Sequence, residues 1–143
     1  MAGWALYAAL VLAALSGALG ESRYEKFLRQ HVDYPRTPVL AAHRYCENML
    51  ARRGVTAPGR PCKPSNTFVH ASPEELSGAC SAAADAAGLH STAAALPLTA
   101  CRLRGGDTRQ PCAYRARQLQ HHVRVACRDG LPVHLAGTRP PAP

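Results

Sequence analysis

The sequence predicts an α+β domain in which helices come first along the chain and strands follow. Helical patterns occupy residues 22–80, whereas apolar and polar residues begin to alternate after residue 96. Six widely spaced cysteines add the expectation of three disulfides, because an even count is typical of secreted domains. The length of 143 residues corresponds to one domain.

The first 20 residues have the composition of a secretory signal peptide. Residues 1–20 hold no charged side chain, and they end in the small-residue pattern ALG. The alternative is a transmembrane anchor, which the short apolar run and the lack of a following basic cluster disfavour. We therefore expect a secreted mature domain, residues 21–143, with a disordered tail at residues 139–143.

The first helix is predicted for residues 22–32. Ser22 and Glu25 form an S-x-x-E capping box at its start. Its apolar face holds residues at helical spacing, namely Tyr24, Phe27, Leu28 and His31. His31 should therefore lie at the edge of the core, either as a functional residue or as a core histidine with satisfied hydrogen bonds.

Two further helices precede the strands. The second is predicted for residues 41–53, where Arg52 and Arg53 favour the negative end of the helix dipole and Gly54 can end the helix. The third should begin with a cap and a proline at residues 72–73 and continue to about Cys80.

The second half of the chain has the period-two pattern of strands. The alanine-rich residues 81–95 predict a loop with at most an edge strand. Asp129-Gly130 is a two-residue hairpin signal. In the last strand, His134 faces away from its two apolar neighbours in the alternation. The predicted strands are residues 96–104, 112–117, 121–128 and 131–135.

The net charge of +8 falls entirely on the mature domain. Lys26 and Lys63 are its only lysines, and the forked guanidinium of arginine matches phosphate oxygens. Nucleic acid, glycosaminoglycan and anionic membrane are the expected partners, and a merely solvated basic surface is the alternative. No C-x-x-C pair or Cys/His cluster suggests a bound metal, and we expect no cofactor.

Three motifs carry a resemblance to a known family. FLRQH at residues 27–31, CKPSNTF at residues 62–68 and GLPVHL at residues 130–135 resemble the pancreatic-type ribonuclease (ribonuclease A) family. The resemblance spans Tyr24–Leu135, and the six-cysteine pattern is similar to the angiogenin and avian leukocyte ribonuclease branch. It implies a monomer with three helices on a curved antiparallel sheet and the disulfides Cys46–Cys101, Cys62–Cys112 and Cys80–Cys127.

The resemblance also implies an activity, the cleavage of single-stranded RNA after pyrimidines without a metal. His31 would take the proton of the RNA 2′-hydroxyl, and His134 would protonate the leaving 5′-oxygen, since imidazole can do either near neutral pH. Lys63 would stabilise negative charge in the transition state. The implied substrate contacts are Gln30 and the Leu135 amide to phosphate, Thr67 to the pyrimidine, and Asn66 of the signature.

Two positions depart from the family pattern. Ala136 stands where an acidic residue usually orients the acid histidine, so we expect reduced turnover. Gly137 stands where a side chain blocks the pyrimidine pocket in angiogenin, so we expect a more open pocket. The region that contacts the second base, residues 80–92, is alanine-rich, which weakens the expectation of a purine contact there.

Other functions are compatible with the same charge. An angiogenin-like signalling protein or a cationic host-defence protein would use its arginine surface, with ribonuclease activity weak or incidental. Arg52 and Arg53 resemble the basic run that angiogenins use for transport into the nucleus, although a helix-terminal charge pair is the simpler interpretation. A disulfide-bonded cytokine without catalysis leaves His31, Lys63 and His134 unexplained.

Overall fold

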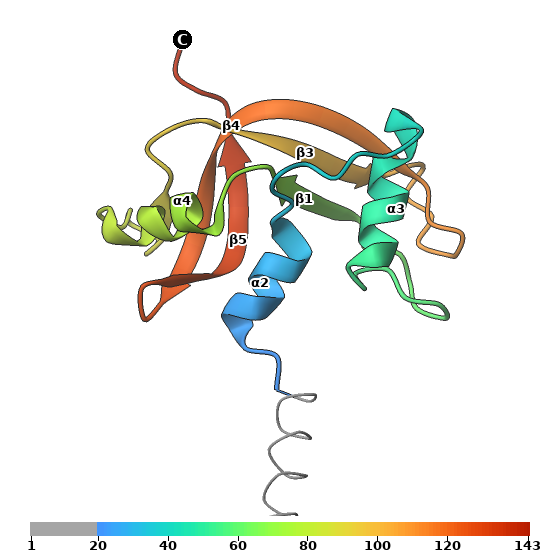
Figure 1. Cartoon of the computed structure of the whole chain (residues 1–143), viewed down its shortest axis with the longest axis horizontal. Helices are drawn as coiled ribbons and strands as arrows, with labels where there is room; N and C mark the ends of the chain where they lie inside the picture. Colours follow the sequence, from blue (N-terminus) through green and yellow to red (C-terminus); the bar gives the residue numbers. More distant parts are fainter. Residues whose placement is uncertain (1–19) are drawn as a thin grey trace, which may run out of the picture.

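The computed structural model describes residues 20–143, so nearly all of the expected signal peptide lies outside the described residues. Within residues 20–143, no helix has the length and apolar character needed to span a membrane. The helices pack against a five-stranded antiparallel sheet (Figure 1). The elements are α2 (Arg23–His31), η1 (Ala42–Arg44), α3 (Tyr45–Arg52), β1 (Ser65–Val69), α4 (Pro73–Gly78), η2 (Ala79–Ser81), β2 (His90–Ser91), β3 (Leu96–Leu103), β4 (Tyr114–Arg128) and β5 (Leu131–Arg139).

The start of α2 confirms the predicted capping box. The Ser22 hydroxyl accepts from the Glu25 amide at 3.0 Å, and the Glu25 carboxylate accepts from the Ser22 amide at 3.1 Å. The helix buries Phe27 and ends at His31, which places that histidine at the edge of the core, as predicted. The helix is thereby held at both the first turn and the buried face.

The second and third predicted helices are each divided into two parts. The predicted helix at 41–53 consists of the 3₁₀ turn η1 followed by α3. Ala41 offers no side-chain cap, and the Arg44 amide instead bonds the Ala41 carbonyl in a tight i→i+3 turn. Likewise the third helix ends at Gly78 and continues only as the turn η2.

Strand β4 corrects the prediction of two separate strands at 112–117 and 121–128. It is a single strand of 15 residues that pairs first with β3 and then with β5, and Figure 1 shows it arching from the α3 side to the β5 side. The intervening polar residues stay in the strand because Gln118 and Gln120 pair with β3. Strand β5 in turn extends to Arg139, so the expected tail begins one residue later.

Two hydrophobic clusters fill the space between helices and sheet. One joins α2 and α4 to β3, β4 and β5, and the other lies between α3 and β1, β3 and β4. The Asp129-Gly130 turn has positive φ at both residues, 54° and 77°, as a type I′ hairpin requires. The disulfides have the pairing that the resemblance implies: Cys46–Cys101 joins α3 to β3, Cys62–Cys112 joins two loops, and Cys80–Cys127 joins η2 to β4.

Candidate active site

A single open cavity of about 350 Å³ brings together every non-cysteine residue that the sequence predicts for the site. The cavity lies between the end of α2, the loop and strand around β1, and the middle of β5. Its lining is Gln30, His31, Lys63, Ser65, Asn66, Thr67, His134, Leu135, Ala136 and Gly137. Residues more than 100 positions apart in the sequence therefore share one solvent-accessible volume.

His31 is held in one orientation by the strand beside it. Its Nδ1 lies 2.9 Å from the backbone carbonyl of Thr67, which can only accept, so Nδ1 carries a proton. The Nε2 atom is then the basic nitrogen of the neutral ring. The pKa of His31 is lowered from 6.5 to about 4, mainly by burial and to a lesser degree by the charges of Lys63 and His134, while the hydrogen bond to the Thr67 carbonyl raises it. A neutral His31 is suited to accept a proton near pH 7.

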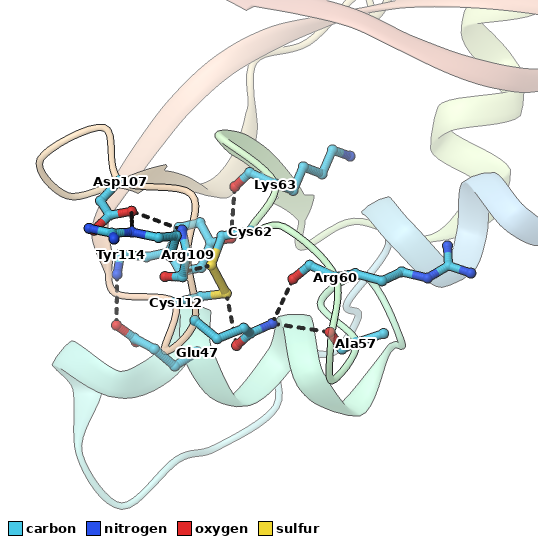
Figure 2. Close-up of a disulfide and its surroundings, with 10 residues drawn as sticks. Glu47, Ala57, Arg60, Cys62, Lys63, Asp107, Arg109, Cys112 and Tyr114 are labelled. Atoms are coloured by element: carbon cyan, nitrogen blue, oxygen red, sulfur yellow. Dashed lines mark hydrogen bonds and ion pairs between the residues drawn. A yellow bond between two sulfur atoms is a disulfide. The ribbon is translucent and has the colours of Figure 1, made fainter.

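Lys63 is fixed at both its backbone and its ammonium group. The Tyr114 hydroxyl donates to the Lys63 carbonyl at 2.7 Å, and the adjacent Cys62 forms the disulfide with Cys112. Figure 2 shows the Lys63 side chain extending away from this disulfide. Its Nζ donates to Asn66 Oδ1 at 2.8 Å. Burial lowers the pKa of Lys63, with a smaller effect from Lys26.

Asn66 has a structural role that sequence reasoning missed. Its side chain is only 4% exposed, and its Nδ2 donates to the Gln30 carbonyl at 2.9 Å while Oδ1 accepts from Lys63. One amide therefore links the end of α2 to the lysine. The alternation in β1 offered a signal, because Asn66 shares the inward face with Phe68. A direct contact between Asn66 and substrate stays a prediction.

His134 is the less constrained histidine of the cavity. It lies exposed on β5, opposite Ala126 of β4. Among residues 20–143, no side chain or backbone group forms a hydrogen bond to its ring. Ala136, two residues further, lines the same cavity with only a methyl group. Reduced turnover through the lack of an acidic residue at this position stays a prediction.

The cavity is open beside Thr67 and Gly137. A Cβ built on Gly137 would meet no atom within 4 Å, and its backbone is not in the left-handed region. The Thr67 carbonyl is used by His31, and within the described chain its hydroxyl has no protein partner. Thr67 and Gly137 line the same cavity.

Comparisons with known proteins agree on one family. The family profile of pancreatic ribonuclease matches residues 22–136. Ribonuclease CL2 of Gallus gallus is 74% identical over 118 residues, covering 82% of this chain and 98% of that protein. Angiogenin of Gallus gallus is 43% identical over 137 residues, covering 94% and 95%.

A solved structure agrees with the sequence comparisons. The crystal structure of green turtle egg white ribonuclease superposes with a TM-score of 0.77 at 46% identity, covering 83% of this chain and 100% of that chain. The chain belongs to the pancreatic ribonuclease family, within its angiogenin and avian branch. It is a pancreatic-type endoribonuclease, and its substrate is RNA.

Proposed function

We propose that this enzyme cleaves single-stranded RNA on the 3′ side of pyrimidines by transphosphorylation. The observation that supports this most directly is the convergence of His31, Lys63 and His134 on one cavity, with the Nε2 of His31 left basic. His31 removes the proton from the ribose 2′-hydroxyl, whose oxygen then attacks the phosphorus. The bond to the 5′-oxygen breaks, and protonated His134 donates its proton to that oxygen.

The first step leaves a 2′,3′-cyclic phosphate and a free 5′-hydroxyl. In the second step the histidines exchange roles, and water opens the cyclic phosphate to a 3′-phosphate. The ammonium of Lys63 stabilises the added negative charge on the phosphoryl oxygens, and loss of one such group typically costs about 2.7–4 kcal/mol. The Gln30 side chain and the Leu135 amide bind the phosphate, while Thr67 binds the pyrimidine beside Gly137.

Defined dinucleotides test the reaction and its specificity. We expect uridylyl- and cytidylyl-adenosine to be cleaved through a cyclic intermediate, and adenylyl-adenosine and a 2′-deoxy analogue to resist cleavage. His31→Ala and His134→Ala should each abolish turnover, and a chelator should leave the rate unchanged because side chains carry both protons. Equal cleavage of the purine dinucleotide, or full activity of either variant, would refute the proposal.

Secretion is the second part of the proposal. Proteins of this family are generally secreted, and we infer that residues 1–20 are removed as a signal peptide. The amino-terminal sequence of protein collected from the medium of expressing cells should begin at Glu21. Retention of residues 1–20 in cell membranes would support the anchor alternative.

A signalling or host-defence role is a second candidate function. The charge of +8 and the 43% identity to a chicken angiogenin favour it, with glycosaminoglycan or anionic membrane as partner. The double variant His31→Ala/His134→Ala separates the roles: cell stimulation or bacterial killing that survives without RNA cleavage depends on surface charge. Nuclear transport through a basic run has Arg52 as its exposed member, whereas the Arg53 side chain has partners within the protein.

A further inference from the structure

The carboxyl end of α2 is held by side chains from two distant segments. The last carbonyls of a helix have no partner within the helix. Here the Gln30 carbonyl accepts from Asn66, as described above. Arg53 is the residue that follows α3. Its Nη1 donates to the carbonyls of Arg29 at 3.0 Å and Val32 at 2.7 Å, and it makes a longer contact of 3.3 Å to the Leu28 carbonyl.

A second arginine returns the contact. Arg29 Nη1 donates to the Arg53 carbonyl at 2.6 Å, so each guanidinium binds the other residue's backbone. Arg53 Nη2 also lies 3.4 Å from the buried carboxylate of Asp33, just after the helix. A positive charge at this end of the helix also interacts favourably with the partial negative charge of the helix terminus. The contacts join α2 to α3 at a place where the two segments are 24 residues apart in sequence.

The residues that Arg53 contacts lie on both sides of His31 in the sequence. Arg29 precedes His31 by two residues and Val32 follows it directly, and the carbonyls of both are bound by the same guanidinium nitrogen. Within residues 20–143, the hydrogen bond to the Thr67 carbonyl of β1 is the only one that the His31 ring makes. Any movement of the helix end would therefore shift the ring relative to the rest of the cavity.

We propose that Arg53 is a positioning residue for the reaction, which sets the place of His31 by fixing the last turn of α2. This inference rests on the proposed function of His31 as the base. It assigns Arg53 to the catalytic geometry and leaves Arg52, its exposed neighbour, to the protein surface. It also predicts that replacing these two adjacent arginines has different effects on kcat.

The test compares Arg53→Gln, Arg53→Lys and the matched control Arg52→Gln on uridylyl-adenosine, well below the unfolding temperature. We expect Arg53→Gln to lower kcat roughly 10- to 100-fold with little change in KM, since a misplacement of about 1 Å can cost about 100-fold. Arg53→Lys should recover part of the rate because its ammonium can still bind carbonyls. Arg52→Gln should retain the wild-type kcat.

Several outcomes would overturn the inference. They are an unchanged kcat in folded Arg53→Gln, a change in KM alone, or an equal loss in Arg52→Gln. If Arg53→Gln does not fold, Arg53→Lys decides: a folded protein with wild-type kcat and an undisturbed His31 ring resonance would support a purely stabilising role. If wild-type protein cleaves RNA but His31→Ala does too, the proposed function fails instead, so the two failures are distinguishable.

Discussion

The Nζ of Lys63 and the side-chain amide of Asn66 form a 2.8 Å hydrogen bond, and the same amide reaches the backbone of Gln30 next to His31. The lysine and the first histidine of the cavity are therefore placed by a shared residue. The motif CKPSNTF contains both partners three positions apart, so one short segment supplies a cation and the group that orients it.

Replacement of Asn66 should impair both placements at once. In Asn66→Ala, the ammonium loses its acceptor and the Gln30 carbonyl loses its donor, and an unsatisfied buried group costs about 1–3 kcal/mol. We expect kcat to fall and the urea midpoint to drop. Asn48→Ala is the matched control, because Asn48 is exposed and its side chain, among the residues that the structure describes, bonds only the Arg44 carbonyl. A wild-type kcat in Asn66→Ala would contradict this role.

The acidic limb of the pH profile should lie unusually low. His31 must be neutral to act as the base, and burial lowers its pKa to about 4 from an ordinary value of 6.5. The free-enzyme profile of kcat/KM should therefore keep its activity through pH 5 and decline near pH 4. An acidic limb at pH 6.5 would show that the ring is solvated like an exposed histidine.

The same pKa affects stability in a defined direction. Between pH 4 and 6.5 the unfolded chain binds a proton at His31 that the folded protein does not. The free energy of unfolding should therefore increase as the pH rises from 4 to 6.5, and this contribution is lost when the pH falls through the same window. Urea titrations of wild type and His31→Gln should show a weaker pH dependence in the variant. Parallel curves would exclude a contribution from His31.

An acidic residue at position 136 should restore support for His134. In Ala136→Asp, a carboxylate near the imidazole can accept its second N–H and favour one orientation. We expect a higher kcat on dinucleotides than in wild type. Ala93→Asp, at an exposed loop position, controls for the added charge. An unchanged or lower rate in Ala136→Asp would contradict the assignment of this position.

The disulfide beside Lys63 should matter for both stability and rate. Replacing Cys62 and Cys112 by alanine should cost about 2–5 kcal/mol of unfolding free energy, the typical cost of removing a native disulfide from a small secreted domain. It should also lower kcat, because Lys63 follows Cys62 directly (Figure 2). Removal of Cys80–Cys127, which closes a loop of similar length, is the control and should lower kcat less. Equal losses of kcat would argue against a special role for Cys62–Cys112.

Local sequence signals determined much of this protein. The capping box of α2, the Asp129-Gly130 hairpin and the alternation in the strands act between near neighbours, so each could be predicted without the fold. The motifs around His31 and His134, read through a family resemblance, also identified the residues that line the cavity.

Tertiary structure alone decided the remaining relationships. The continuity of β4 depends on its pairing with β3, and the placement of α2 depends on Arg53 and Asn66, which bind its carbonyls from 24 and 36 residues away. A hydrogen bond to a backbone carbonyl leaves no mark in the sequence of the acceptor, because every residue has that carbonyl. Only the folded chain therefore shows which donor reaches the helix that bears His31.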